Sequence, residues 1–496
     1  MNPALVVIAI FFLVAIGLGL AARRGRQMNL EQWSLGGRGF GTIIVFLLMA
    51  GEIYTTFTFL GGSGWAYGQG GPAFYILAYM LIAYTLSYFI LPVIWRYAKE
   101  QQLVSQADYF VRKYDSPALG VLVAVVSVIA CIPYLVLQLK GLGIIVSEAS
   151  YGSIEPNAAV WAGGAALVVF VVASGVRGSA WTAVLKDVMI LAAAMFAGIY
   201  LPLHYYGGYG AMFTAIEQAK PGFLVLPERG MSTSWFISTV ILTGLGFYMW
   251  PHTFGSVYTA RHERVLRKNA VILPVYALVL VFVFFAGFAA VLQVPGLHGS
   301  DADLSMLRIA KLAFTPVMVG MLGAAGVLTA LVPGSMLLVM STTIIAQNIY
   351  RPMARGADEH RVAIVARSAV PFVTLLAIWL TLRGGSAIVP LLLMGYSLVT
   401  QLMPAVLLSL WDRPRASAAG AFAGIVAGEL VVAFVTVSGA SLSDLIPAAP
   451  QVIKDLNIGI VALLVNVLVL GVVSLFTARP LGAVTSRFVE SHEDGY

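Results

Sequence analysis

Apolar residues occur along this chain in runs of about 20, the number that a helix needs to cross the hydrocarbon core of a bilayer. Short polar segments separate the runs from one end of the chain to the other. This pattern predicts an all-α polytopic membrane protein with about thirteen transmembrane helices. We place these spans at residues 4–22, 41–67, 72–95, 118–148, 157–175, 181–204, 233–257, 270–293, 314–346, 365–382, 386–409, 417–437 and 457–478.

The segments between the predicted spans differ in their content of lysine and arginine. If the N-terminus lies outside, 22 of the 29 basic residues fall in inside segments, six fall in outside segments, and Lys140 lies within a span. Cytoplasmic segments of membrane proteins are enriched in basic residues. We therefore expect an integral, multi-pass protein of the bacterial inner membrane, with its N-terminus outside and its C-terminus in the cytoplasm.

Composition argues against the other classes of protein. The chain is 60% hydrophobic and only 10% charged, whereas soluble domains carry roughly 25% charged residues. Its single cysteine, Cys131, lies in an apolar run and its six histidines are scattered, so we expect no disulfide, metal site or cofactor. Its basic residues form no continuous face for nucleic acid. We expect a transport protein and not an enzyme, with a small molecule and the lipid bilayer as partners and its oligomeric state left open.

The second predicted span contains a polar, glycine-rich interruption. It reads AGEIYTT at residues 50–56 and continues as GGSG at residues 61–64, which places Glu52 near the middle of the membrane. Irregular backbone at that depth is stable only where protein or a water-filled cavity surrounds it, so the interruption indicates a binding site. The alternative is a kinked helix whose glycines serve close packing, which leaves Glu52 unexplained.

Three further spans carry interruptions. Span seven has Gly244 and Gly246 followed by Trp250, Pro251 and His252; span nine has the sequence PGS at residues 333–335; and span eleven has Gln401 and a proline at position 404. Spans two and seven are five apart, and a pair of broken helices in corresponding places is typical of an inverted-repeat transporter with a site at the midplane.

The chain resembles the solute:sodium symporter family. The motifs that carry the resemblance are LGGR at residues 35–38, GxGWxxG at 62–68, SxxDYFxRKY at 105–114, GVR at 175–177 with WT at 181–182, PH at 251–252, Pro404 with Trp411, and the glycines at 420, 424 and 428. The resemblance implies a LeuT-like core of two inverted five-helix repeats, at residues 41–205 and 206–410, with an extra N-terminal helix in residues 1–40 and extra helices in residues 411–496. Residues 50–57 and 181–187 look most like the branch of the family that imports monocarboxylates such as pyruvate and lactate.

The resemblance also implies a place for the coupling ion, between spans two and nine. The family's two sodium-binding hydroxyls align with Val332 and Pro333, which have none, and its carbonyl positions fall near the residues Met49, Glu52 and Thr329. A shift of one turn in the alignment would bring Thr329 or Ser335 to a hydroxyl position. Proton coupling is therefore slightly favoured over sodium coupling, and both stay open.

Lys186 lies where proton-coupled relatives in the same superfamily place an ammonium in the position of sodium. We expect Lys186 and Glu52 to form a pair that takes up and releases a proton. The alternative is that Lys186 extends to the inner surface as part of the positive-inside signal. Lys140 is assigned to helix packing or charge balance.

The predicted function is secondary active import of a short monocarboxylate by alternating access. Free backbone amides after the break in span two favour a carboxylate, and the expected substrate-binding residues are Glu52, Tyr54, Thr55, Thr56, Tyr248, Trp250, His252 and Gln401. The alternatives are a sodium-coupled symporter for an amino acid, pantothenate or another small solute, and, from other classes, a channel or a membrane-embedded enzyme. Counterflow separates carriers from channels, because only a carrier exchanges labelled for unlabelled solute.

Overall fold

The computed structural model describes residues 2–22, 29–354 and 356–477, and within these ranges the regular structure is helical. The first half of the chain forms α1 (Pro3–Ala21), α2 (Leu30–Leu35), α3 (Thr42–Gly51), α4 (Gly62–Gln69), α5 (Tyr75–Glu100), α6 (Gln106–Tyr114), α7 (Pro117–Ala149), α8 (Pro156–Tyr206), α9 (Tyr209–Ala219), α10 (Thr233–Gly246) and α11 (Pro251–Tyr258). The second half forms α12 (Glu263–Ala277), α13 (Leu280–Gln293), α14 (Ser305–Ala313), α15 (Pro316–Ile344), α16 (Arg351–Met353), α17 (Glu359–Arg383), α18 (Ile388–Val399), α19 (Met403–Leu408), α20 (Ala418–Ser438), α21 (Leu442–Leu445), α22 (Gln451–Lys454) and α23 (Ile458–Thr477). Short helical turns join several of them: η1 (Gly36–Arg38), η2 (Phe57–Gly61), η3 (Gly71–Phe74), η4 (Phe247–Met249), η5 (Gly299–Leu304), η6 (Ile345–Tyr350) and η7 (Thr400–Leu402).

Ten helical segments in the described ranges are long and apolar enough to cross a membrane. One of them, α8, has 51 residues and contains Gly175 with a left-handed φ of 58°, which divides it where the sequence predicts the end of one span and the start of the next. Two shorter apolar helices, at Thr42–Gly51 and Thr233–Met249, correspond to the predicted broken spans. The all-helical membrane fold is confirmed, and the number thirteen stays a prediction. Of the basic residues used to predict orientation, those at 23, 24, 26, 355, 479 and 487 lie outside the described residues.

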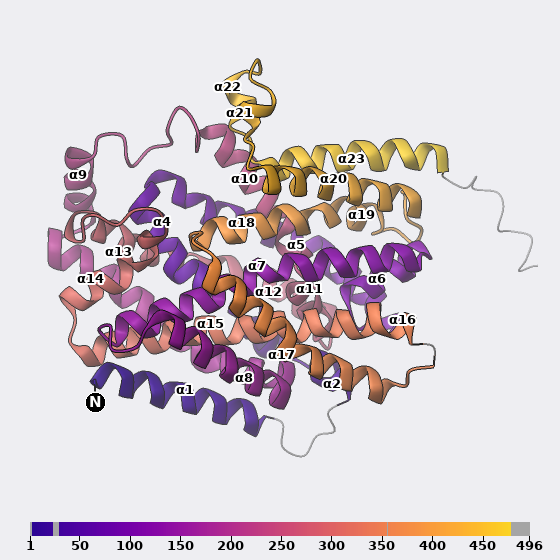
Figure 1. The fold of residues 1–496 in the computed structure, drawn as a ribbon, viewed down its shortest axis with the longest axis horizontal. Helices are drawn as coiled ribbons and strands as arrows, with labels where there is room; N and C mark the ends of the chain where they lie inside the picture. Colours follow the sequence, from indigo (N-terminus) through magenta and orange to yellow (C-terminus); the bar gives the residue numbers. More distant parts are fainter. Residues whose placement is uncertain (1, 23–28, 355, 478–496) are drawn as a thin grey trace, which may run out of the picture.

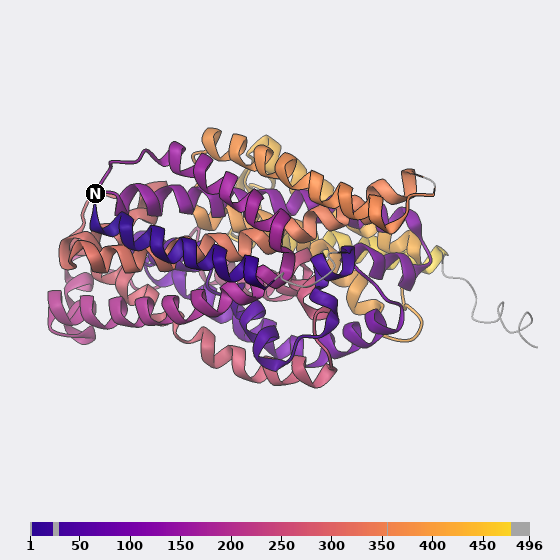
Figure 2. The ribbon, with the colours of Figure 1, turned by 90° about the horizontal axis from the view of Figure 1, so that it is seen from below.

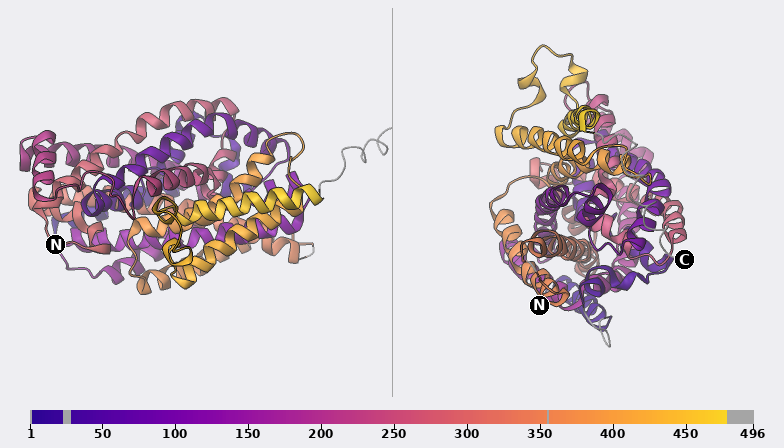
Figure 3. Two further views of the ribbon diagram at one scale, coloured as in Figure 1. Left: turned by 90° about the horizontal axis from the view of Figure 1, so that it is seen from above. Right: turned by 90° about the vertical axis from the view of Figure 1, so that its right-hand side faces the viewer.

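The long helices run side by side along one direction (Figure 1), and α1 crosses the face formed by α8 and α15 (Figure 2). The end-on view in Figure 3 shows α20 and α23 as a pair on one side of the bundle. The helices α3, α7, α8 and α15 pack against one another in the interior, and the best apolar 18-residue stretch of the span Pro316–Met353 is 100% buried. The C-terminal end of α3, from Leu48 to Gly51, is buried in this interior, whereas Ile43 near its start is 74% exposed.

The predicted interruptions of spans two and seven are confirmed, whereas span nine is not interrupted, because α15 continues through Pro333. Helix α3 ends at Gly51, residues 52–55 are not part of a regular helix, and a π-helical turn leads into α4. Helix α10 passes through a 3₁₀ turn to Trp250, whose ψ of 133° is extended, and α11 then begins at Pro251. Proline suits this first helical position because its missing N–H would have no partner inside the helix.

The two broken spans are joined at one end, where Phe40 precedes α3 and Thr259 follows α11. Phe40, just before α3, donates its N–H to the carbonyl of Thr259 over 3.0 Å, and its own carbonyl accepts the N–H of Arg261 over 3.1 Å. At the other end, Gly64 of α4 lies so close to η5 that an added Cβ would be 2.9 Å from the carbonyl oxygen of Ala302. The space between the two breaks is therefore covered from both ends.

Candidate functional site

A small enclosed cavity lies between the two broken spans. Its lining includes Glu52 and Phe57 from the first break, Tyr134 from α7, and Trp250 and His252 from the second break. About 10 Å³ is open to a sphere of water size, which is room for a single water molecule. Because both ends of this space are covered and its volume is small, a solute larger than water cannot enter it without movement of the lining.

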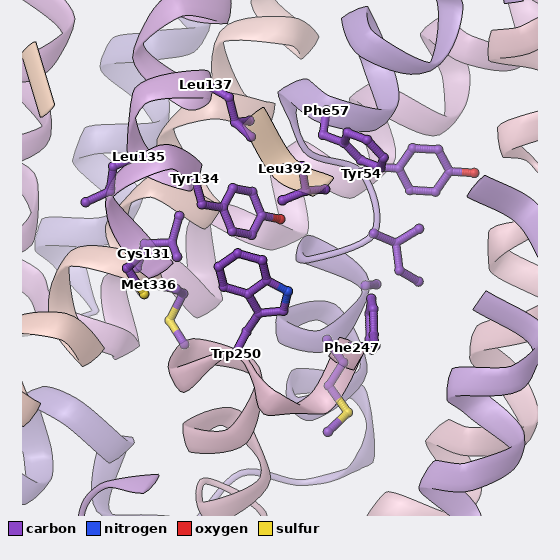
Figure 4. Packing of buried hydrophobic residues seen from close by; sticks show 14 of the residues in the cluster. Tyr54, Phe57, Cys131, Tyr134, Leu135, Leu137, Phe247, Trp250, Met336 and Leu392 are labelled. Atoms are coloured by element: carbon purple, nitrogen blue, oxygen red, sulfur yellow. The ribbon is translucent and has the colours of Figure 1, made fainter. Parts of the chain in front are cut away.

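Aromatic rings form most of the cavity wall. The ring centroid of Tyr134 is 4.9 Å from that of Trp250 and 5.3 Å from that of His252, and the Trp250 ring is 5.3 Å from that of Tyr396. Figure 4 shows the Tyr134 ring beside the Trp250 indole, with Phe57 and Leu392 close by. Neither Nε1 of Trp250 nor Nδ1 of His252 has a hydrogen-bond partner among the described residues, although both atoms are buried. The wall thus offers polar atoms that the fold leaves unused.

Glu52 is 6% exposed, and both of its carboxyl oxygens lack a hydrogen bond from any described residue. The hydroxyl groups of Thr253 and Ser256 on α11 lie close to it without meeting ordinary hydrogen-bond geometry. A buried carboxyl group without partners is costly and marks a functional site by default. Its oxygens are available to a proton or a ligand at the cavity wall.

Lys186 is fully buried, so the structure contradicts the alternative that it extends to the inner surface. Its ammonium nitrogen lies 2.8 Å from Oδ1 of Asp187 and donates to the carbonyl of Tyr54 over 3.2 Å. Lys186 forms its ion pair with Asp187 and not with Glu52 in this conformation, and the expected proton-sharing pair of Lys186 and Glu52 stays a prediction. Glu52 acts on Lys186 only through longer-range electrostatic attraction.

The ammonium of Lys186 occupies the break in the first broken span. A Cβ built on Gly51 would lie 3.5 Å from the Lys186 nitrogen and 3.6 Å from Cγ1 of Val332. Val332 is one of the two residues on α15 that align with the family's sodium-binding hydroxyls. The lysine therefore lies between spans two and nine, where the sequence placed the coupling ion.

The other residues expected at the ion site have partners within their own helices. The hydroxyl of Thr329 donates to the carbonyl of Gly326 over 2.6 Å, and Ser335 donates to the carbonyl of Val332 over 2.6 Å. The backbone carbonyl of Met49 accepts the N–H of Glu52 over 3.2 Å. In this conformation these oxygens are held by the fold itself.

The side chains of Tyr54, Thr55 and Thr56, at the break, face different neighbours. The hydroxyl of Tyr54 donates to the carbonyl of Tyr276 over 3.1 Å, so its ring lies beside α12, and Oγ1 of Thr55 accepts the N–H of Phe57 over 3.1 Å. The N–H of Thr56 faces Oε1 of Gln138 at 3.4 Å. Oγ1 of Thr56 and Nε2 of Gln138 are both buried without a partner among the described residues. Thr56 is therefore the member of this trio with a free hydroxyl.

Tyr248 and Gln401 do not line this small cavity, so their expected contacts with the substrate stay predictions. Tyr248 lines a separate small space with Ser87 and Met403, because η4 turns its side chain away from that of Trp250. Gln401 lies in η7 and donates to the carbonyls of Ser397, over 3.0 Å, and Gly459, over 3.3 Å. Its side chain faces α20 and α23.

Several polar residues of the interior were not among the site candidates predicted from the sequence. Asp187 was visible as a charge beside Lys186, and Glu429 as a lone carboxyl group in the span 417–437. Tyr276 and Gln138 gave no signal, because their importance depends on which helices lie next to one another. No group of three or more histidine, cysteine, aspartate or glutamate residues in the described part of the chain is placed to bind a metal.

Lys140, in the second half of α7, contacts two segments between helices. Its nitrogen donates to the carbonyl of Ser386 over 2.7 Å and lies 3.6 Å from Oδ2 of Asp303, which also accepts the N–H of Ile388 over 3.0 Å. Asp303 lies in η5, outside the candidate spans, and burial raises the pKa of its carboxyl group to about 6, against the lowering effect of Lys140 and the Ile388 amide. This cluster agrees with the assignment of Lys140 to packing and charge balance.

Replacing Lys140 by methionine is expected to destabilise the protein by about 1–3 kcal/mol at pH 8, because the buried carboxylate of Asp303 loses a partner. Lysine stabilises only the ionised form of Asp303, so this contribution is present above the pKa of about 6 and is lost as the pH falls below it. Thermal unfolding of both proteins in detergent at pH 5 and pH 8 measures the difference. An equal loss at the two pH values would contradict the assigned contact.

Comparisons with known proteins place this geometry in context. A model of the sodium:solute symporter family matches residues 33–428. The chain is 58% identical to the Bacillus subtilis protein named uncharacterized symporter YhjB, over 98% of this chain and 100% of that protein. It is 28% identical to a monocarboxylate transport permease protein of Rhizobium johnstonii, over 87% of this chain and 89% of that protein. A solved structure of a Na⁺-coupled sialic acid symporter in a substrate-bound, outward-open state has a similar fold, with a TM-score of 0.80, 14% sequence identity, and coverage of 96% of this chain and 98% of that one.

Proposed function

This chain belongs to the sodium:solute symporter family, and from that premise we propose that it imports a short monocarboxylate such as pyruvate or lactate together with a proton. Import proceeds by alternating access around the cavity between the two broken spans. No cofactor takes part in the proposed cycle; the coupling ion is H⁺, with Na⁺ as the alternative.

The observation that carries the proton coupling is the buried ammonium of Lys186 at the break in α3, beside Val332. An ammonium at this place supplies a fixed positive charge where the family binds Na⁺, and electrostatic repulsion disfavours a second cation there. The absence of hydroxyl groups on Val332 and Pro333 removes two of the oxygens that Na⁺ would need. Both features favour a cycle without Na⁺.

The cavity supports a small anionic substrate. Nε1 of Trp250, on the cavity wall, is buried and unpaired among the described residues and can donate a hydrogen bond to a carboxylate. Oγ1 of Thr56 is also unpaired among them but lies beside Gly141 of α7, outside the lining, and we assign it to the substrate as a second donor. His252 adds an unpaired Nδ1, and the aromatic rings offer contact area for a methyl group. The 28% identity to a monocarboxylate permease supports the same substrate class.

Glu52 sets a condition on binding. An ionised carboxylate at the cavity wall would repel an anionic substrate across a region with little water. We therefore assign Glu52 a neutral or paired state whenever the substrate is bound. In this scheme Tyr54 belongs to the group around Lys186, and Thr55 stabilises the backbone of the break.

We also propose that residues 41–205 and 206–410 are the two inverted repeats, with residues 1–40 and 411–496 added at the ends. The interrupted spans at α3 and α10 support this division, because they stand at corresponding places of the two segments.

The test of the substrate is counterflow in proteoliposomes loaded with unlabelled pyruvate, lactate, proline or pantothenate. Labelled pyruvate should enter transiently above equilibrium only when the vesicles hold pyruvate or lactate. Exchange with proline or pantothenate but not with the monocarboxylates would replace the proposed substrate.

The proposed location is the inner membrane with the N-terminus outside, supported by the distribution of basic residues. In intact cells, a cysteine at Gly208, beside α9, should react with an impermeant maleimide, while one at Met353, which is 79% exposed beside α16, should react only after permeabilisation. The buried native Cys131 serves as the background control. The reverse labelling pattern would invert the topology.

A further inference from the structure

Near the cavity the fold buries the ion pair of Lys186 and Asp187, and the acidic member, Asp187, has no role in the scheme so far. Asp187 is 3% exposed, its Oδ1 lies 2.8 Å from the ammonium of Lys186, and the hydroxyl of Tyr276 donates to the same oxygen over 3.1 Å. Its other oxygen, Oδ2, is buried and has no hydrogen-bond partner among the described residues. One oxygen is thus held by two donors and the second is vacant as an acceptor.

We propose that Asp187 is the residue that carries the coupled proton, on Oδ2, while Lys186 keeps its positive charge throughout the cycle. This inference rests on the proposed function and deepens it, because it names the proton-binding group of the coupling site. Tyr276 is a positioning residue that holds Oδ1 and leaves Oδ2 for the proton.

The argument for Asp187 comes from the net charge of the occluded states. A net charge enclosed in a membrane protein costs several kcal/mol, so the states in which both ends are closed are most stable when neutral. The empty site holds an ammonium and a carboxylate, which cancel. When a monocarboxylate anion binds, one proton on Asp187 restores neutrality, because the ammonium then balances the substrate.

The charge balance makes coupling obligatory. Substrate without a proton leaves the occluded site with one negative charge, and a proton without substrate leaves it with one positive charge. Both states are disfavoured, so the carrier crosses either empty or with both ligands. The proton comes from water on the outer side and returns to water on the inner side, and no bond other than the O–H bond forms or breaks.

The surroundings of the pair contain few other titratable groups. Glu52 and Tyr54 face it from the break in the first broken span, Tyr276 from α12, and Tyr84 acts electrostatically on Glu52 and Tyr54 from α5. The packed helices α1 and α15 contain no charged side chain. Glu52 lines the cavity and forms no ion pair with the ammonium of Lys186. Asp187 is therefore the carboxyl group whose Oδ1 pairs with the ammonium while its Oδ2 is open to a proton.

The test uses purified full-length protein in sodium-free proteoliposomes with an inward gradient of one pH unit. The wild type should accumulate labelled pyruvate roughly tenfold. Asp187→Asn mimics the protonated carboxyl group, so it should keep pyruvate counterflow but reach an accumulation ratio of about one, because the empty carrier retains an uncompensated positive charge. Glu429→Gln is the matched control: it removes another intramembrane carboxyl group, distant in the chain on α20, and should keep the tenfold accumulation.

A second variant covers the case in which Asp187→Asn does not fold with Lys186 left unpaired. Lys186→Met with Asp187→Asn removes both charges and should also lose pH-driven accumulation. Tenfold accumulation in either folded variant would overturn the assignment of the proton to Asp187 and leave the proposed function intact. A wild type that accumulates pyruvate only in response to sodium would overturn both the proposed coupling and this inference.

Discussion

Lys186→Ala should abolish proton-driven accumulation of pyruvate and also slow pyruvate exchange. A gradient of one pH unit supplies about 1.4 kcal/mol, which is roughly tenfold accumulation at one proton per solute, and the variant should fall to a ratio of about one. The physical reason is that the bound anion loses the buried charge that balances it. Exchange slows for the same reason, because the loaded carrier without the ammonium encloses the uncompensated charge of the anion.

Lys140→Met is the matched control for this prediction. It removes the other lysine within a span, whose nitrogen contacts Ser386 and Asp303 and which does not line the cavity, and should keep the wild-type accumulation ratio. The amount of reconstituted protein, measured on the same vesicles, separates loss of transport from loss of protein. Full accumulation by Lys186→Ala would show that the lysine only fills space in the core.

Thr56→Val should raise the KM for pyruvate about 10- to 100-fold, since an unsatisfied carboxylate oxygen of the bound substrate costs about 1–3 kcal/mol. The substitution keeps the shape of the side chain and removes the hydroxyl, which has no partner among the described residues. The amount of protein in the membrane should be unchanged. Initial rates of uptake over a range of pyruvate concentrations measure the effect.

Thr374→Val provides the comparison for this second prediction. The Thr374 hydroxyl donates to the carbonyl of Val370 within α17, so its loss should leave the KM unchanged. Thr55→Val is different again, because Oγ1 of Thr55 holds the N–H of Phe57 and its removal should lower the yield of folded protein. Wild-type KM in Thr56→Val would place the substrate carboxylate elsewhere in the cavity.

The sequence predicted the parts of the fold that local pattern controls. Runs of apolar residues gave the membrane helices, and the glycines, prolines and polar residues around Glu52 and Trp250 gave the two breaks, because irregular backbone in a membrane needs those residues nearby. A lysine within an apolar run could also be placed at the ion site through the family resemblance. These signals lie within a single span each.

The errors concern contacts between spans. The pair of Lys186 with Asp187, and the role of Tyr276 in holding it, depend on α8, α12 and the break being neighbours, which no single-span pattern contains. Tyr248 and Gln401 were expected to bind the substrate, and their side chains lie in other parts of the interior. The 3₁₀ turns η4 and η7 change the direction of side chains there, so sequence distance does not give the facing side.

The orientation in the membrane and the division into two repeats were both predicted from the sequence, and cysteine labelling tests the orientation. The predicted orientation rests on the lysine and arginine residues between the spans, and the packing of the helices is the same for either orientation. Labelling of single cysteines at Gly208 and at Met353 therefore tests the orientation in the membrane, which helix packing does not determine.

The most direct test of the central claim is uptake of labelled pyruvate by the wild-type protein under separately imposed pH and sodium gradients. The account predicts roughly tenfold accumulation for each pH unit in sodium-free medium, with little effect of added sodium. A monocarboxylate that moves with one proton is neutral, so a membrane potential, worth about 2.3 kcal/mol per net charge per 100 mV, should hardly change the result. Accumulation that requires sodium and is indifferent to pH would contradict the account and restore a sodium ion to the place assigned to Lys186.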